Sequence, residues 1–121
     1  MSEKPLIQIW HGADKMPLIN IKAGSWVFDM GTSEVNENQY TGGIFIKDEF
    51  AVDLKNDSFP GNEWKYILEG EWHMIQNGEK LVAKPGDVVF LPKGTAFQSL
   101  KNPFKAFFVT NRGAQEHKPY K

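Results

Sequence analysis

Turn residues divide the second half of the chain into short segments. Gly70, Asn77-Gly78, Pro85-Gly86 and Pro92-Lys93-Gly94 each follow a short run rich in β-branched or aromatic side chains. An Asn-Gly pair is a strong signal for a two-residue β-hairpin. No window of about a dozen residues keeps the i, i+3, i+4, i+7 apolar pattern of an amphipathic helix. The sequence therefore predicts an all-β protein, in which short strands build a sandwich or barrel.

The expected strands lie between these and similar turn residues, at 6–10, 25–30, 43–46, 50–54, 65–69, 72–75, 81–83, 88–91, 96–100 and 104–110. We expect one domain over residues 1–121, with a motif-bearing core at about 41–110 and a polar tail at 111–121 that frays. The run 88–91 is apolar on both faces of its strand, so both faces should be covered. In so small a chain another subunit often supplies the second cover, and we therefore expect a homodimer.

Composition excludes several classes of function. The formal net charge is −1, and nucleic-acid binding normally needs a basic excess. No apolar run approaches the roughly 20 residues of a transmembrane helix, so no membrane partner is expected. Residues 1–5 lack the apolar core of a signal peptide, which favours a cytoplasmic location. The absence of cysteine excludes thiol catalysis and cysteine-ligated metals.

Two segments have a more specific spacing. Six residues separate Glu63 from Gly70, and the second segment reads Gly86, five residues, Pro92, one residue, Gly94. Together these segments resemble the two motifs of the cupin superfamily, and the match is concentrated between about residues 59 and 110. The resemblance implies a cupin double-stranded β-helix, which is a small jelly-roll barrel built from two sheets.

A metal-binding cupin offers two histidines one residue apart, then the glutamate, then a later histidine, a set that suits a divalent first-row metal. In this sequence the first two positions fall among Asn56, Asp57, Ser58 and Phe59, and the last position is Phe97. Of the four ligands implied by the resemblance, only Glu63 remains. We therefore expect a metal-free protein without a cofactor. The alternative is an atypical metal site built from Asp57, Glu63 and His73.

Within the cupins, segments 59–60, 68–73 and 83–94 resemble the ethanolamine-utilisation Q-like group, which also lacks the full histidine set. The resemblance implies a link to bacterial microcompartments and an acetate kinase activity. Full-length members carry an additional N-terminal region that is not in this sequence. The sequence has no P-loop and no glycine-rich phosphate cradle, so the kinase activity is implied by the resemblance alone.

The alternation of side chains along a strand suggests the catalytic residues. If Glu63 points into the barrel as the motif implies, Lys65 and Ile67 share its face. Glu63 and Lys65 would then form an acid–amine pair that can hold a polar substrate or exchange protons with it. The lysine could also form a Schiff base with a carbonyl compound. The alternative is a solvated, inert ion pair at the mouth of the barrel.

Further side chains are candidates for binding a ligand: Asp57, Ser58, Trp64, Trp72 and Phe97. Phe97, at the position of a lost metal ligand, would make the pocket wall apolar. Asp57 and Ser58 could bond to a hydroxyl or an amine, or they could simply form a turn. A tryptophan such as Trp64 could stack on a flat ligand, plug the barrel end or lie in a dimer interface. If His73 is not a ligand of the atypical metal site, we expect it to be a surface or interface histidine.

These residues favour a barrel pocket for a small polar metabolite. The expected chemistry is metal-independent acid–base catalysis of the dehydratase, lyase or isomerase type, with Glu63 and Lys65 as the catalytic pair. Two alternatives remain open. The chain could be a non-catalytic sensor of a carboxylate, amine or sugar, or it could be an accessory protein in a larger assembly.

Overall fold

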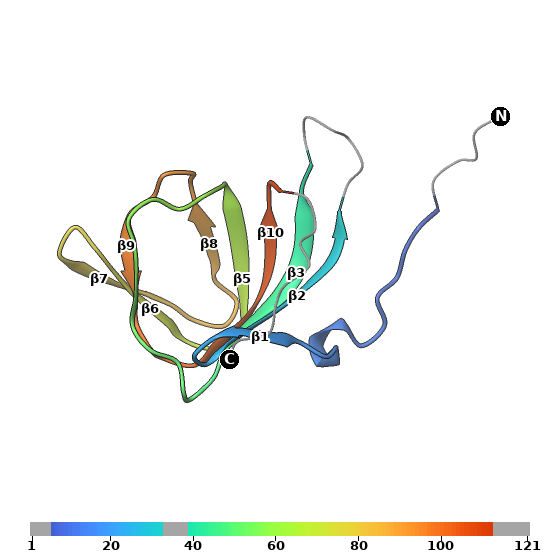
Figure 1. Ribbon diagram of the computed structural model, residues 1–121, viewed down its shortest axis with the longest axis horizontal. Helices are drawn as coiled ribbons and strands as arrows, with labels where there is room; N and C mark the ends of the chain where they lie inside the picture. Colours follow the sequence, from blue (N-terminus) through green and yellow to red (C-terminus); the bar gives the residue numbers. More distant parts are fainter. Residues whose placement is uncertain (1–5, 33–38, 113–121) are drawn as a thin grey trace.

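The computed structural model describes residues 6–32 and 39–112, which form two antiparallel sheets (Figure 1). A short 3-10 helix, η1 (Ala13–Lys15), precedes the strands. The strands are β1 (Ile19–Lys22), β2 (Ser25–Thr32), β3 (Thr41–Lys47), β4 (Leu54–Asn56), β5 (Glu63–Gly70), β6 (Trp72–Gln76), β7 (Glu79–Ala83), β8 (Val88–Leu91), β9 (Phe97–Ser99) and β10 (Phe104–Thr110).

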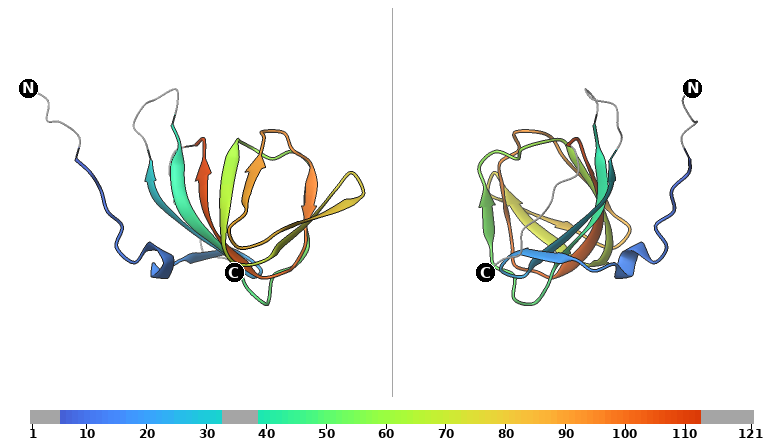
Figure 2. Two further views of the ribbon diagram at one scale, coloured as in Figure 1. Left: turned by 180° about the vertical axis from the view of Figure 1, so that it is seen from behind. Right: turned by 45° about the vertical axis from the view of Figure 1, so that its right-hand side comes forward.

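The larger sheet has the strand order β1-β2-β3-β10-β5-β8, and the smaller has the order β4-β9-β6-β7. Figures 1 and 2 show the two sheets curving toward each other to form a barrel. β10, the last strand in the chain, lies between β3 and β5 in the larger sheet. This order brings the end of the described chain against segments from its first half.

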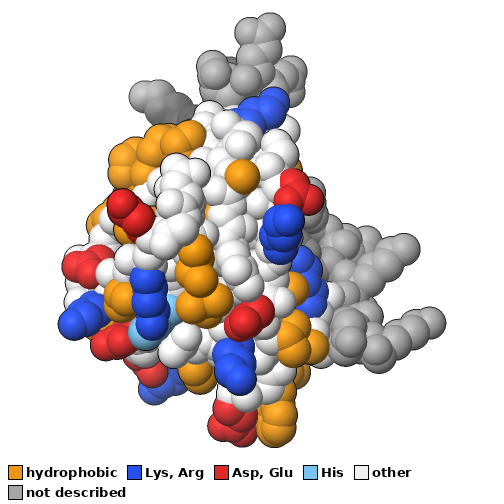
Figure 3. All heavy atoms as spheres, turned by 90° about the vertical axis from the view of Figure 1, so that its left-hand side faces the viewer, with side chains coloured by type: hydrophobic (Ala, Val, Ile, Leu, Met, Phe, Trp, Pro, Cys, Tyr) orange, Lys and Arg blue, Asp and Glu red, His pale blue; other side chains and the backbone are white. Residues whose placement is uncertain are grey.

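The core lies between the two sheets and follows from strand alternation. On β5 the buried residues are Glu63, Lys65 and Ile67, as the sequence predicts, and on β6 they are Trp72 and Met74. The outer face of the smaller sheet instead mixes hydrophobic side chains with side chains of both charges (Figure 3). Each sheet therefore turns one face to the barrel interior and one to solvent.

Two of the predicted turns require residues with a positive φ angle. Asn77 and Gly78 both have positive φ (51° and 77°), as a two-residue hairpin turn between β6 and β7 requires. Gly70 has a φ of 72°, and a Cβ added there would lie 2.4 Å from the carbonyl oxygen of Pro103. The motif glycine therefore allows β5 to end against the loop before β10.

The strand predictions fail at three places in the first half. Segment 6–10 is not a strand and leads away from the barrel (Figure 1), because alternation without a partner strand provides no ladder of hydrogen bonds. Segment 50–54 is mostly a loop, in which the Asp48 carboxylate accepts a hydrogen bond from the Phe50 N–H (2.8 Å). The sequence reading also missed β1, which pairs with β2.

The predicted polar tail begins later than expected. Asn111 exchanges hydrogen bonds with Asn62, and the Thr41 hydroxyl donates to the Arg112 carbonyl (2.6 Å). These two residues are therefore held against the barrel, whereas 113–121, including His117, lie outside the described residues. In the part of the chain that the structure describes, no helix is long and apolar enough to cross a membrane.

Candidate functional site

A cavity of about 190 Å³ lies inside the barrel, between the two sheets. Its walls are largely aromatic, from Phe45, Phe59, Trp72, Phe97, Phe104 and Phe108. The Trp72 ring stacks on Phe104 (centroids 5.1 Å apart) and meets the Phe97 ring edge-on (6.0 Å). Such a wall is rigid, because packed rings leave few alternative rotamers.

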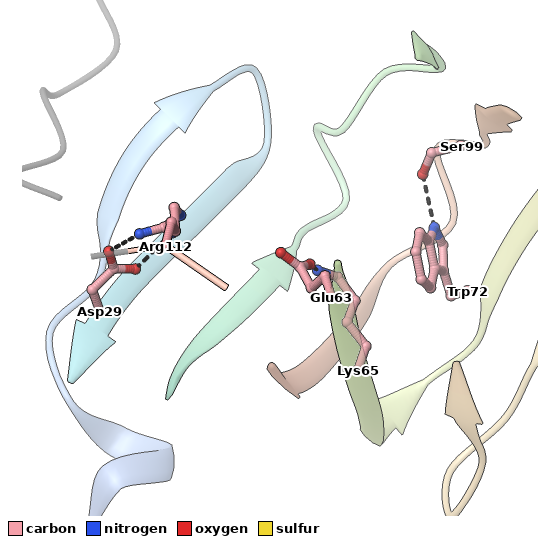
Figure 4. A network of polar contacts seen from close by, with 6 residues as sticks. All are labelled: Asp29, Glu63, Lys65, Trp72, Ser99 and Arg112. Carbon is pink, nitrogen blue, oxygen red and sulfur yellow. Dashed lines mark hydrogen bonds and ion pairs between the residues drawn. The ribbon is translucent and has the colours of Figure 1, made fainter. Parts of the chain in front are cut away.

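Glu63 and Lys65 place opposite charges on this apolar wall. They lie two residues apart on β5, are only 8% and 7% exposed, and both line the cavity. The Lys65 ammonium donates a hydrogen bond to the Glu63 carboxylate (Figure 4). This pair is buried, so the alternative of a solvated pair at the barrel mouth does not describe its position.

Three aromatic rings surround the Lys65 ammonium. Its Nζ lies 5.0 Å from the ring centroid of Phe45, 5.4 Å from that of Phe108 and 5.7 Å from that of Trp72. The negative face of an aromatic ring attracts a cation, and the attraction grows where water is excluded. The rings and the Glu63 carboxylate together offset the cost of burying this charge.

A second buried lysine, Lys47 at the end of β3, also lines the cavity. It is 3% exposed, and its Nζ donates to the Ser99 hydroxyl (2.8 Å) and to the Leu100 carbonyl (3.1 Å). Trp72 Nε1 donates to the same Ser99 oxygen (2.8 Å; Figure 4). Burial lowers the pKa of Lys47 from 10.5 to about 8, against the opposing charge of Asp53. The Lys47 ammonium is therefore held by neutral oxygens.

Arg112 completes the polar lining. Its guanidinium makes two hydrogen bonds to the Asp29 carboxylate (2.6 and 3.2 Å) and lies 6.0 Å from the ring centroid of Phe108. Figure 4 shows this pair on one side of Glu63 and Lys65, with Trp72 and Ser99 on the other. Two-point bonding of this kind fixes the orientation of both groups.

Positive charge exceeds negative charge around the cavity. Of the described residues that line it, the cationic ones are Lys22, Lys47, Lys65 and Arg112, and the single carboxylate is that of Glu63. Lys65 is paired with Glu63 and Arg112 with Asp29, so the excess positive charge comes from Lys22 and Lys47. This excess favours a ligand that carries a negative charge.

The structure brings together four of the predicted site residues and leaves out three. Phe97 and Trp72 line the cavity with Glu63 and Lys65. Asp57 and Ser58 are exposed and do not line it, because β4 ends at Asn56, which lines the cavity, and both residues follow it in a bend. The Asp57 carboxylate lies 3.7 Å from the Lys55 amine at the surface.

Trp64 also lies outside the predicted pocket. The alternation that turns Glu63 and Lys65 inward turns Trp64 outward, where it is 52% exposed. Its ring packs on Phe90 of the neighbouring strand β8, with centroids 4.4 Å apart. Trp64 therefore does not line this cavity.

The residues present do not fit the metal site of the cupin fold. Of the family's ligand positions, only Glu63 offers a metal-binding side chain to the cavity, and Lys65 already binds its carboxylate. His73 points away from the core and bonds to Glu71 (2.9 Å), which holds the pKa of the Glu71 carboxyl below its usual value. Among residues 6–32 and 39–112, no three His, Cys, Asp or Glu side chains form a metal-binding group, so Asp57, Glu63 and His73 do not meet.

Sequence reasoning missed Lys47, Ser99 and Arg112. Lys47 begins the charged run 47–49, which resembles a strand end at the surface, and Arg112 follows the last strand. Ser99 gave no signal beyond its place in a predicted strand. The inward parity of Phe97 and Ser99 on β9 is the one pattern that could have suggested it.

The two facing antiparallel sheets are those of a cupin barrel. The structure resembles an RmlC-like cupin from Shewanella frigidimarina, with a TM-score of 0.66 and 16% identity over 91% of this chain and 95% of that one. The EutQ protein of Clostridium difficile aligns with a TM-score of 0.59 and 24% identity over 75% of this chain and 70% of that one.

A narrower family is defined by the sequence. The family described as "Ethanolamine utilisation protein EutQ" matches residues 23–112, and the chain belongs to this family. The acetate kinase EutQ of Salmonella typhimurium is 46% identical over 37 residues, and that of Escherichia coli is 43% identical over 37 residues. These matches cover 31% of this chain and only 16% of each curated relative.

Proposed function

We propose that this cupin binds a small polar metabolite in its barrel and performs metal-independent acid–base chemistry on it. The reaction would be of the dehydratase, lyase or isomerase type. One observation carries the proposal: a carboxylate and an ammonium group, Glu63 and Lys65, lie in contact on the wall of a largely aromatic cavity. Buried ionisable pairs in pockets are frequent at catalytic sites.

The two groups have complementary roles toward a carbonyl compound. Glu63 would take a proton from the carbon next to the carbonyl, and Lys65 would donate a hydrogen bond or a proton to the carbonyl oxygen. The electron pair of the broken C–H bond would then move into an enol or enolate. If Glu63 returns the proton to a different carbon, the result is isomerisation. If it gives the proton to a hydroxyl on the β-carbon, that hydroxyl leaves as water, a C=C bond forms and the result is dehydration.

The kinase activity of the curated relatives is not part of this proposal. The shared 37-residue segment covers 16% of those proteins, and the present sequence has no P-loop or glycine-rich phosphate cradle.

A solvent-exchange experiment tests the proposal without knowledge of the net reaction. The protein is incubated in D₂O with pyruvate, 2-oxobutyrate or hydroxyacetone, and proton NMR follows deuterium entry next to the carbonyl. We expect the wild type to accelerate exchange for at least one compound. Glu63→Gln should slow that exchange by about 100-fold or more, the usual loss when a general base is removed.

Glu69→Gln is the matched control, because Glu69 lies on the same strand but is exposed. It should exchange as the wild type does. If the wild type binds one of these compounds but neither it nor the variants accelerate deuterium exchange, the alternative of a non-catalytic binding protein is favoured. An equal rate in the wild type and in Glu63→Gln would remove Glu63 from the chemistry.

A further inference from the structure

Lys47 and Ser99 present two hydrogen-bond donors that the proposed acid–base chemistry does not use. A protonated lysine has three N–H groups, and the Ser99 oxygen and Leu100 carbonyl take two of those of Lys47. The Ser99 oxygen accepts from both Lys47 and Trp72, which occupies its two lone pairs. The third N–H of Lys47 and the hydroxyl proton of Ser99 therefore remain as donors.

The hydrogen-bond partners of Lys47 are neutral, and the opposing charge of Asp53 acts on its ammonium only from beyond ion-pair distance. No carboxylate of the described residues lies within ion-pair distance of its Nζ, in contrast to Lys65 with Glu63 and Arg112 with Asp29. Lys47 is nevertheless buried and lines the cavity. Burying an ammonium group against neutral oxygens alone costs free energy, and a bound anion would recover part of it.

We propose that Lys47 and Ser99 form a subsite for the carboxylate group of a small organic acid. A carboxylate is planar with two oxygens, so it matches one N–H and one O–H donor on adjacent side chains. The aromatic walls would hold the rest of a small acid, whereas phosphate would expose further oxygens to apolar rings. The subsite deepens the proposed function, since it defines the substrates of the Glu63–Lys65 pair as small organic acids.

Trp72 gives this subsite its own reporter. Its indole N–H donates to the Ser99 oxygen, so a carboxylate bound at Ser99 would change the environment of that proton. The chain has four tryptophans, and each contributes one indole N–H signal to a nitrogen–proton correlation spectrum. The Trp72 signal is assigned by its loss in Trp72→Phe.

The test titrates lactate and its uncharged isostere lactamide into the protein and follows these signals. We expect lactate to shift the Trp72 signal saturably and lactamide to bind at least tenfold more weakly. Lys47→Met should weaken lactate binding at least tenfold, and Ser99→Ala several-fold. Lys55→Met, which removes an exposed lysine outside the cavity, should bind lactate within about twofold of the wild type.

Several results would overturn the subsite. These are equal binding of lactate and lactamide, unchanged binding by Lys47→Met, no saturable binding of lactate, or phosphate binding as tightly as lactate. The comparison of lactate with lactamide needs only the wild type, so a variant that fails to fold does not block the test. Glu63→Gln separates the two proposals: it should slow solvent exchange by about 100-fold or more and still bind lactate, because it removes no donor from the subsite.

Discussion

Asp29 and Arg112 lie 83 residues apart in the chain and form a two-point ion pair at the cavity. Asp29 is on β2, and Arg112 follows β10. β3 lies between these strands in the sheet, so the pair ties the end of the described chain across three strands. The Asp29 side chain is almost fully buried, whereas that of Arg112 is partly exposed.

This asymmetry predicts unequal effects of the two truncations. Arg112→Ala leaves a buried carboxylate without its guanidinium, whereas Asp29→Ala leaves a guanidinium that can reach water. We expect Arg112→Ala to lower the free energy of unfolding by about 2–3 kcal/mol and Asp29→Ala by less. Urea denaturation of both variants and of the double variant measures the coupling. Additive losses would show that the pair contributes nothing of its own.

Lys47 should make stability depend on pH above neutrality. Its pKa is about 8 when folded and 10.5 when unfolded, so the unfolded chain holds more protons between these values. Below pH 8 the buried Lys47 ammonium lowers the free energy of unfolding by its full amount. This unfavourable contribution is lost as the pH rises from about 8 to 10.5, so the free energy of unfolding increases over that range. We expect the stability of Lys47→Met relative to the wild type to fall as the pH rises through this window.

Denaturation curves at pH 7, 8.5 and 9.5 measure this difference. Asp53 and Lys22 act on the Lys47 charge, and Glu63, Lys65 and Arg112 share its cavity. All of these groups remain in Lys47→Met. The difference in unfolding free energy between the wild type and Lys47→Met at each pH therefore isolates the contribution of Lys47. Lys55→Met serves as the exposed control and should show no such trend. A difference that stays constant from pH 7 to 9.5 would contradict the prediction.

The donor set of the cavity predicts metal content. We expect protein purified without a chelator or tag to contain far less than about one transition-metal ion per chain, because Glu63 is bound to Lys65 and no histidine of the described residues joins it. Mass spectrometry of the metals, read against protein concentration, checks this. Close to one equivalent of a single metal would point to ligands among the residues that the structure does not describe.

The outer face of β5 and β8 is the predicted dimer interface. Trp64 packs on Phe90, and Val88 is exposed beside them on the edge strand of the larger sheet. An exposed apolar patch on an edge strand favours association with another chain. We expect a homodimer by light scattering after size exclusion, and a monomer for Trp64→Lys with Phe90→Glu. Phe50→Lys, which changes an exposed hydrophobic residue of the loop before β4, should leave the mass unchanged.

Local patterns alone predicted much of the fold and half of the site. The alternation along β5 places Glu63, Lys65 and Ile67 on one face, and the Asn77-Gly78 pair makes its hairpin. These features depend on neighbours in the chain, where side-chain period and turn geometry are set by the backbone itself. The cupin fold itself came from the resemblance of the segments around Glu63, Gly70, Gly86, Pro92 and Gly94 to the two cupin motifs.

The rest of the site was decided by which distant strands meet. Lys47 and Ser99 are 52 residues apart and come from different sheets, and Arg112 reaches β2 only because β10 pairs with β3. No local period encodes such contacts, since they follow from the order of strands and from the facing of two sheets. Strand alternation, together with the cupin resemblance, was therefore enough to predict a barrel with an inward acid–amine pair. That a buried lysine and an arginine line the same cavity follows from the pairing of distant strands, which no local pattern predicts.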